Sequence, residues 1–223
     1  MNKTITDDSY DKSLAVKCVN GTFVGKLADS TMVFRGIPYV GQQPVGELRW
    51  KAPVDVVPCD SVYEAYYNAK SACQPEVEVS SYYYQDENCL YLNVWKSAKA
   101  TEEQRPVIVW IHGGAYAYGG TVDPLYDFHN FVEENPDVIV VSAAYRLGVL
   151  GFLHLSHLLD GIGRFSLRVE SIGVDNPEDF NIRQHITRIV CGFLPAGRRI
   201  QGRHIFYDVC DGVKAVWQKG FKP

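Results

Sequence analysis

Two apolar runs separated by a glycine-rich loop and a helical pattern constrain the fold of this chain more than any other feature. Pro106–Ile111 and Asp137–Ser142 are rich in Val and Ile, which is typical of strands covered on both faces. Pro106–Ile111 is a better candidate for the centre of the sheet than the alternating segment Leu90–Trp95. After the glycines, Asp123-Pro124 starts a helical pattern that Asn135-Pro136 ends. This order predicts a right-handed parallel crossover, and therefore an α/β fold built on an open sheet.

Shorter β elements are predicted before this core. Asn20-Gly21, between Ser13–Val19 and Thr22–Leu27, is the strongest signal for a two-residue turn and predicts a small antiparallel N-terminal hairpin. Thr31–Arg35 predicts a further strand, which Gly36–Tyr39 should end in a turn. Leu90–Trp95 alternates in the manner of another strand.

Charge and hydropathy narrow the classes of partner. The 223 residues carry a formal charge of -4, and the sequence pI is near 5.9, so neither a nucleic acid nor an anionic membrane surface is an expected partner. No apolar stretch approaches the roughly 18 to 20 residues that span a bilayer. The first ten residues lack the apolar segment of a secretion signal. We therefore expect a cytoplasmic protein whose six cysteines are mostly reduced.

The loop after the first apolar run is the candidate site. In His112–Tyr116, two glycines follow the strand directly, so main-chain N–H groups can approach a ligand and turn toward one point. Donors arranged in this way stabilise an oxyanion. A tight turn that merely requires positive φ explains the same residues equally well. A phosphate loop is disfavoured, because neither GxxxxGK[ST] nor a clean GxGxxG is present.

Five motifs in order resemble the type B carboxylesterase/lipase family, the cholinesterase-like α/β-hydrolases. They are Gly36-Ile37-Pro38-Tyr39, Gly46-Glu47-Leu48-Arg49-Trp50, Asn88-Cys89-Leu90-Tyr91-Leu92-Asn93-Val94-Trp95, Val109-Trp110-Ile111-His112-Gly113-Gly114-Ala115-Tyr116 and Tyr145-Arg146-Leu147-Gly148. The resemblance covers residues 14–160 and only the N-terminal portion of a typical member. It implies an α/β-hydrolase fold and hydrolysis of small carboxylic esters through an acyl-enzyme on a serine, with no metal and no cofactor.

The resemblance also implies roles for individual residues. The main-chain N–H groups of Gly114 and Ala115 would form two arms of an oxyanion hole, whose third arm is the residue after the nucleophile. Arg49 and Glu87 would match a buried ion pair, although two solvated surface charges are the alternative.

The resemblance also has implications for the segment between Cys73 and Cys89. Cys73 and Cys89 match a disulfide loop of secreted members, but free thiols are favoured because no secretion signal is seen. Tyr82–Tyr84 lies in the same loop, where members place aromatic residues that line the gorge. Exposed tyrosines that pack on the loop itself are an equally good interpretation.

No nucleophile is recognisable. The family requires a G-x-S-x-G turn on the next strand of the sheet, and residues 1–223 contain none. Ser156, Ser166 and Ser171 lack the flanking glycines, and His185 and His204 lie outside any motif of the family. We therefore expect the chain alone to be inactive. A non-catalytic, cholinesterase-like interaction module is the alternative.

The last part of the chain differs from the rest. Residues 1–160 hold 12 basic and 20 acidic residues and form the predicted carboxylesterase domain, whereas residues 161–223 hold 10 and 6. A nucleic-acid-binding tail is disfavoured, because its arginines are dispersed. The segment resembles no part of the family and is left unassigned. A shifted reading frame is favoured over a gene fusion or a divergent tail.

A sheet that lacks its later strands is expected to have an open edge. Without its next parallel neighbour, Asp137–Ser142 would expose unpaired main-chain groups, so self-association is expected.

Overall fold

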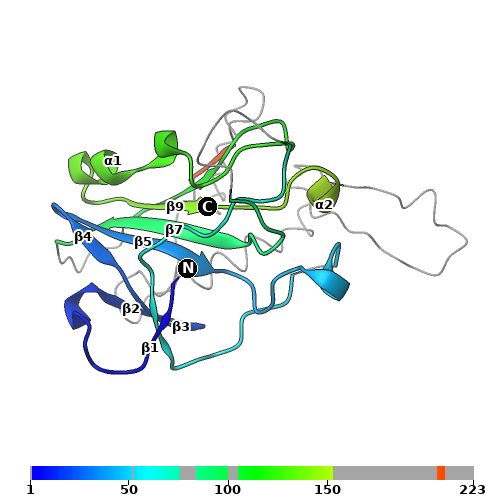
Figure 1. Ribbon diagram of the computed structural model, residues 1–223. Helices are drawn as coiled ribbons and strands as arrows, with labels where there is room; N and C mark the ends of the chain where they lie inside the picture. Colours follow the sequence, from blue (N-terminus) through cyan, green and yellow to red (C-terminus); the bar gives the residue numbers. More distant parts are fainter. Residues whose placement is uncertain (1, 52, 76–83, 100–104, 153–204, 209–223) are drawn as a thin grey trace, which may run out of the picture.

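The computed structural model describes residues 2–51, 53–75, 84–99, 105–152 and 205–208 (Figure 1). Several residues considered above therefore lie outside the described residues: Tyr82, Tyr83, Ser156, Ser166, Ser171, His185 and His204. Tyr84 is described, and its side chain is exposed. None of the described helices is both long and apolar enough to cross a membrane.

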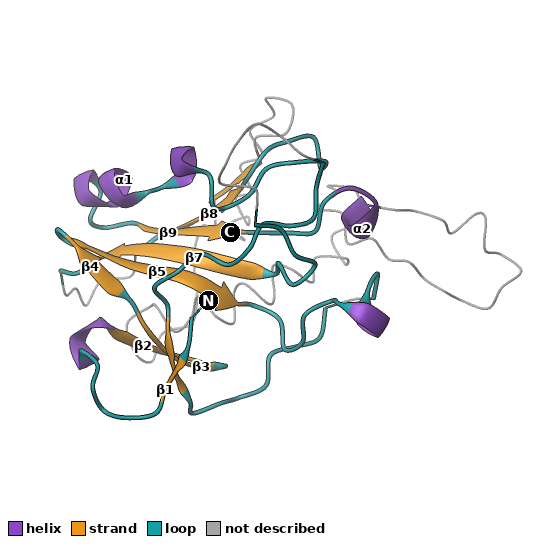
Figure 2. Ribbon diagram, viewed as in Figure 1, coloured by secondary structure: helices purple, strands orange, loops and turns teal. Residues whose placement is uncertain are grey.

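A mixed six-stranded sheet forms the centre of the molecule (Figure 2). Its strands in spatial order are β10 (Ile205–Asp208), β8 (Val107–Ile111), β9 (Ile139–Ala143), β7 (Tyr91–Ser97), β5 (Thr31–Pro38) and β4 (Lys26–Ala28). The strands β8 and β9 are parallel, with Val107 opposite Ile139 and Ile111 opposite Ala143. The predicted parallel crossover is confirmed.

The positions of β8 and β9 correct two expectations. All five residues of β9 are buried, whereas β8 alternates between buried and half-buried residues. The strand β9 is therefore covered on both faces whereas β8 is not, and β9 and β7, rather than β8, lie at the centre of the six-stranded sheet. The predicted open edge at Asp137–Ser142 is also wrong, because β9 pairs with β7 on one side and with β8 on the other. The antiparallel β7 supplies this neighbour, and β8 uses its second edge for β10.

A second, four-stranded sheet contains the predicted hairpin. Its order is β1 (Thr4–Ile5), β6 (Val62–Glu64), β3 (Gly21–Val24) and β2 (Ala15–Cys18). Cys18 lies opposite Gly21, so the two turn residues are Val19 and Asn20, one position earlier than expected. The predicted strand Thr22–Leu27 is divided at Gly25, after which β4 joins the other sheet.

The strand β5 runs further than predicted. It continues past Arg35 to Pro38, because a bulge between Phe34 and Ile37 absorbs the expected turn. Gly36 adopts φ 70° within the bulge, and its N–H donates to the side-chain oxygen of Asn93 at 2.9 Å. Phe34 and Ile37 are both fully buried in the core beside this kink.

The helix expected after Asp123-Pro124 is divided into two pieces. A 3₁₀ turn spans Pro124–Tyr126, and α1 spans only His129–Glu134. The carboxylate of Asp127 separates them, because it accepts from Trp95 Nε1 at 3.0 Å and from the main-chain N–H of His129 at 3.1 Å. The other helical segments within the described residues are 3₁₀ turns at Lys12–Leu14 and Gly46–Leu48 and the helix α2 at Gly148–Phe152.

The helix α1 covers one face of the central sheet (Figure 1). Val132 of α1 is fully buried in a cluster with Val33, Trp95 and Val140. The ring of Phe128, just before the helix, meets the Trp95 ring edge-on at a centroid distance of 5.4 Å. This packing fixes α1 and the loop that leads from β8 to it.

Candidate functional site

The glycine loop, defined here as Gly113–Gly119, follows the C-terminal end of β8. Three consecutive residues have positive φ: 125° at Gly114, 52° at Ala115 and 58° at Tyr116. The carbonyl of Gly114 accepts hydrogen bonds from the N–H groups of Ala117 and Tyr118, at 3.0 and 3.1 Å. A Cβ atom on Gly114 would lie 1.8 Å from the carbonyl oxygen of Tyr118. Glycine is therefore required at this position.

The predicted site residues keep their main-chain donors available. No acceptor among the described residues bonds to the N–H of Gly114 or of Ala115. Ala115 is exposed, and Gly114 is half-buried. The left-handed conformation of Ala115 costs about 1 to 2 kcal/mol, which the surrounding contacts must offset. The loop thus presents two successive N–H donors at the end of the sheet.

Gln74 holds one end of the glycine loop. Its side-chain oxygen accepts from the N–H of Gly119 at 2.8 Å, and its side-chain nitrogen donates to the carbonyl of Gly119 at 3.0 Å. The same nitrogen donates to the carbonyl of Ala72 at 3.1 Å, and the N–H of Gln74 donates to the side chain of Gln85 at 2.8 Å. The Gln74 side chain therefore bonds both main-chain groups of Gly119, as a neighbouring strand would. It connects the loop to a segment that is distant in sequence.

The helix α2 holds the other side of the glycine loop. The N–H of Gly148, the first residue of α2, donates to the carbonyl of Tyr116 at 2.7 Å. The rings of Tyr116 and Phe152 lie with centroids 4.6 Å apart. Tyr145, just before α2, meets Phe152 edge-on at 6.2 Å. The strained Ala115–Tyr116 region is thus fixed from both sides.

His112, just before the glycine loop, is buried, and its ring is neutral at pH 7. It stacks on Tyr145 at a centroid distance of 4.3 Å, and the Tyr145 hydroxyl donates to the carbonyl of His112 at 2.6 Å. Burial lowers the pKa of His112 from 6.5 to about 4. Its Nδ1 lies 3.0 Å from the carbonyl oxygen of Gly113. Glycine is also required at Gly119, which has φ 108°, because a Cβ atom there would lie 2.4 Å from the carbonyl oxygen of Gly113 and 2.7 Å from this Nδ1.

Arg49 and Glu87 form the expected pair, but the pair is not buried. The guanidinium donates through Nε and Nη2 to both carboxylate oxygens, and this bond to Glu87 raises the pKa of Arg49. The side chains are 40% and 23% exposed. The pair therefore joins the turn at Gly46–Leu48 to the segment before β7 from a half-buried position.

Cys59, Cys73 and Cys89 form no disulfide among the described residues. Burial raises the pKa of Cys89 to about 12 and also raises the pKa of Cys73. Both line one small cavity beside Arg49 and Glu87. At neutral pH both thiols are therefore protonated. Cys191 and Cys210 lie outside the described residues.

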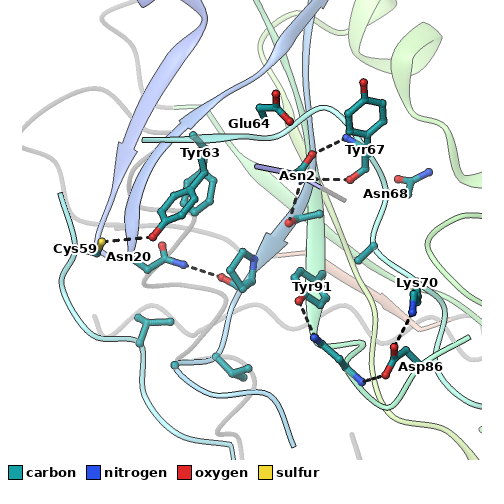
Figure 3. A pocket seen from close by; sticks show the side chains of 18 of the residues that line it. Asn2, Asn20, Cys59, Tyr63, Glu64, Tyr67, Asn68, Lys70, Asp86 and Tyr91 are labelled. Carbon is teal, nitrogen blue, oxygen red and sulfur yellow. Dashed lines mark hydrogen bonds and ion pairs between the residues drawn. The ribbon is translucent and has the colours of Figure 1, made fainter. Parts of the chain in front are cut away.

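A cavity of about 370 Å³ lies elsewhere, between the small sheet and the start of β7 (Figure 3). Its polar lining groups are paired with one another in part. The hydroxyl of Tyr91 donates to Asn88 at 2.6 Å, and Lys70 pairs with Asp86 at 2.8 Å. None of its lining residues belongs to the glycine loop. This cavity is therefore separate from the site that the loop defines.

Similarity to known proteins identifies the family of this chain. Residues 12–161 match the model of the carboxylesterase family. The chain belongs to this family. The described fold is an N-terminal portion of the α/β-hydrolase fold seen in solved carboxylesterases. The carboxylesterase EST55 of Geobacillus stearothermophilus superposes with a TM-score of 0.69 at 30% identity, over 86% of this chain and 37% of that one.

Two curated relatives show how much of the family this chain spans. The cAMP-regulated D2 protein of Dictyostelium discoideum is 41% identical over 138 residues, which are 60% of this chain and 25% of the relative. The para-nitrobenzyl esterase of Bacillus subtilis is 39% identical over 140 residues, which are 61% of this chain and 28% of the relative. The chain therefore spans about a quarter of the length of these relatives.

Proposed function

We propose that this chain contributes to the hydrolysis of small carboxylic esters, and that the N–H groups of Gly114 and Ala115 bind the oxyanion of the tetrahedral intermediate. The observation that carries the proposal is the glycine loop itself. Its two donors lack acceptors among the described residues, and the loop is held by Gln74 and by Gly148. Membership of the carboxylesterase family supports the same chemistry.

The physical basis is electrostatic preorganisation. When a serine attacks an ester carbonyl, negative charge develops on the carbonyl oxygen, and donors already in place stabilise it without reorganising. Each such donor contributes about 3 to 4 kcal/mol of transition-state stabilisation. The strain at Ala115 is the cost of holding the donors ready, and the contacts of Tyr116 and Gly119 offset it. The chemistry proceeds through an acyl-enzyme and calls for no cofactor.

We propose further that the 223-residue chain alone has at most a trace of activity. Acyl transfer needs an activated serine, and no G-x-S-x-G occurs in residues 1–223. Incubation with a short-chain nitrophenyl ester should give no acyl burst, and a fluorophosphonate probe should label no serine. Labelling of Ser156, Ser166 or Ser171 would overturn this proposal.

A chimera tests the catalytic role of the loop directly. Residues 12–152 would replace the matching segment of the Bacillus subtilis para-nitrobenzyl esterase, which supplies the rest of its own fold. We expect hydrolysis of a nitrobenzyl ester. Gly114→Ala should lower kcat by about 10² to 10³, because the added Cβ displaces the donors.

Gly46→Ala is the matched control. Gly46 also has a positive φ, 57°, but a Cβ there meets nothing within 4 Å, so kcat should stay near that of the unmodified chimera. A folded chimera that is inactive before any substitution would argue against the proposal. Such a result would favour the non-catalytic interaction module.

A further inference from the structure

Three side chains that could ligate a metal ion converge at the end of the sheet opposite the glycine loop. His129 and Glu133 lie one helical turn apart on α1, and Asp29 lies in the turn between β4 and β5 (Figure 1). Asp29 Oδ2 is 3.2 Å from His129 Nε2, and Glu133 Oε2 is 3.6 Å from the same nitrogen. The three ligand atoms all lie within 4.8 Å of one another.

Hydrogen bonding accounts for only part of this arrangement, because His129 Nε2 bonds to Asp29 Oδ2 at 3.2 Å while Glu133 Oε2 lies beyond hydrogen-bond distance at 3.6 Å. A histidine Nε2 carries at most one hydrogen, yet two carboxylate oxygens face it. The two carboxylates also repel each other at this separation. A divalent cation between the three atoms would compensate both negative charges and use the ring nitrogen as a neutral ligand.

The distances fit a small tetrahedral ion. Zinc bonds to histidine nitrogen and carboxylate oxygen are about 2.0 to 2.2 Å long, which places neighbouring ligand atoms of a tetrahedron about 3.4 Å apart. The two distances to His129 Nε2, 3.2 and 3.6 Å, lie on either side of this value. The two carboxylate oxygens lie at most 4.8 Å apart, so they need to approach by about 1.4 Å at most. The side chain of Asp29 is 77% exposed and can make this movement.

The carboxylate of Glu133 is already oriented for ligation. Its other oxygen, Oε1, accepts from the N–H of Ser30 at 3.2 Å and from the Ser30 hydroxyl at 3.0 Å. These bonds leave Oε2 directed at His129. The turn that carries Ser30 is itself held, because the Ser30 carbonyl accepts from the N–H of Ala98 at 2.8 Å. Outer contacts of this kind are typical of functional metal ligands.

We propose that Asp29, His129 and Glu133 form a zinc-binding site that joins the β4–β5 turn to α1, with water as the fourth ligand. The donor set of one imidazole and two carboxylates suits Zn²⁺. Register places the site at the end of the sheet where β9 begins, since Thr31 of β5 pairs with Ser97 and Lys96 of β7 pairs with Ile139. The glycine loop follows the opposite end of β8, so the site is structural and not catalytic.

Zinc uptake by the full chain tests the proposal. Equilibrium dialysis should show that the unmodified chain binds one more equivalent of Zn²⁺ than Asp29→Asn or Glu133→Gln. Ser30→Ala should weaken the affinity about 10-fold or more, because it removes a bond that orients Glu133. The matched control is Glu134→Gln, an exposed carboxylate next in sequence on α1, which should bind zinc as the unmodified chain does.

Cobalt distinguishes this site from the cysteines. Co²⁺ in a tetrahedral nitrogen and oxygen site shows visible d–d absorption, whereas thiolate ligands add an intense charge-transfer band in the near ultraviolet. We expect d–d bands in the unmodified chain that Asp29→Asn abolishes, and no thiolate band lost with them. Because Asp29 is exposed, this variant leaves the fold intact. Equal zinc uptake by the unmodified chain and Asp29→Asn, or no saturable uptake at millimolar zinc, would overturn the proposal.

Discussion

His112 couples the stability of the fold to pH at the scale of a single residue. Its pKa is about 4 in the folded chain, against 6.5 as the ordinary value, because burial disfavours the charged ring. Between these two values the unfolded chain binds more protons than the folded one, so stability falls as the pH is lowered from 6.5 toward 4. Lowering the pH from about 7 to about 5 should therefore cost about 2 kcal/mol in the free energy of unfolding.

Urea unfolding of the full chain at these two pH values measures the effect. His112→Asn lacks a titrating ring, so it should be less stable overall but nearly independent of pH in this window. If the variant keeps the full pH dependence of the unmodified chain, the titrating group is not His112.

The sequence predicts Gly114 and Ala115 as site residues because a short motif contains them. No local pattern marks Gln74, which lies 45 residues before Gly119, its partner in the loop. The cluster of Asp29 and His129 was missed for the same reason, since 100 residues separate its members. Contacts between distant segments depend on how the sheet folds, and local periodicity does not record them.

At the scale of elements, two glutamine side chains replace missing strand neighbours. Gln74 bonds both main-chain groups of Gly119, and Gln43 does the same for Leu90, at 3.0 and 3.2 Å. Loss of such a side chain leaves main-chain groups without partners, which costs about 1 to 3 kcal/mol. Gln74→Ala should therefore loosen the glycine loop and leave the start of β7 unchanged.

Hydrogen exchange at two amides checks this prediction, and the two variants control each other. In Gln74→Ala the Gly119 amide should exchange faster while the Leu90 amide keeps its rate. Gln43→Ala should show the reverse pattern. Faster exchange at both amides in either variant would mean that the loop and β7 open together, contrary to the prediction.

The divided helix and the bulged strand are two elements whose bounds differ from those that the sequence predicts. The apolar spacing from Leu125 to Val132 predicts one helix, but Asp127 bonds to Trp95 and so leaves the helical conformation. Gly36 predicts a turn, but Asn93 bonds its N–H and keeps the chain in the sheet. In both cases a side chain from β7 decides the outcome, so tertiary contact overrides the local pattern.

At the scale of the whole molecule, the order of strands determines which strand edge could pair with a second chain. The strand β9 is enclosed, whereas β8 would present an open edge without β10. The register of β10 is complete, with Ile205 opposite Ile108 and Asp208 opposite Ile111. The strand β10 therefore covers main-chain groups that would otherwise pair with a second chain. Composition alone did not predict this pairing, because Ile205–Asp208 lies in the segment left unassigned.

Disruption of β10 should consequently cause self-association. Tyr207→Pro removes a main-chain N–H and fixes φ within β10, so it should release the strand from β8. Tyr207→Ala keeps the N–H and serves as the matched control. Sedimentation velocity should show larger species for Tyr207→Pro than for the unmodified chain or Tyr207→Ala, with faster hydrogen exchange in Val107–Ile111. The prediction is wrong if Tyr207→Pro sediments as the unmodified chain does and the amides of β8 exchange no faster. In that case β10 does not prevent self-association through the edge of β8.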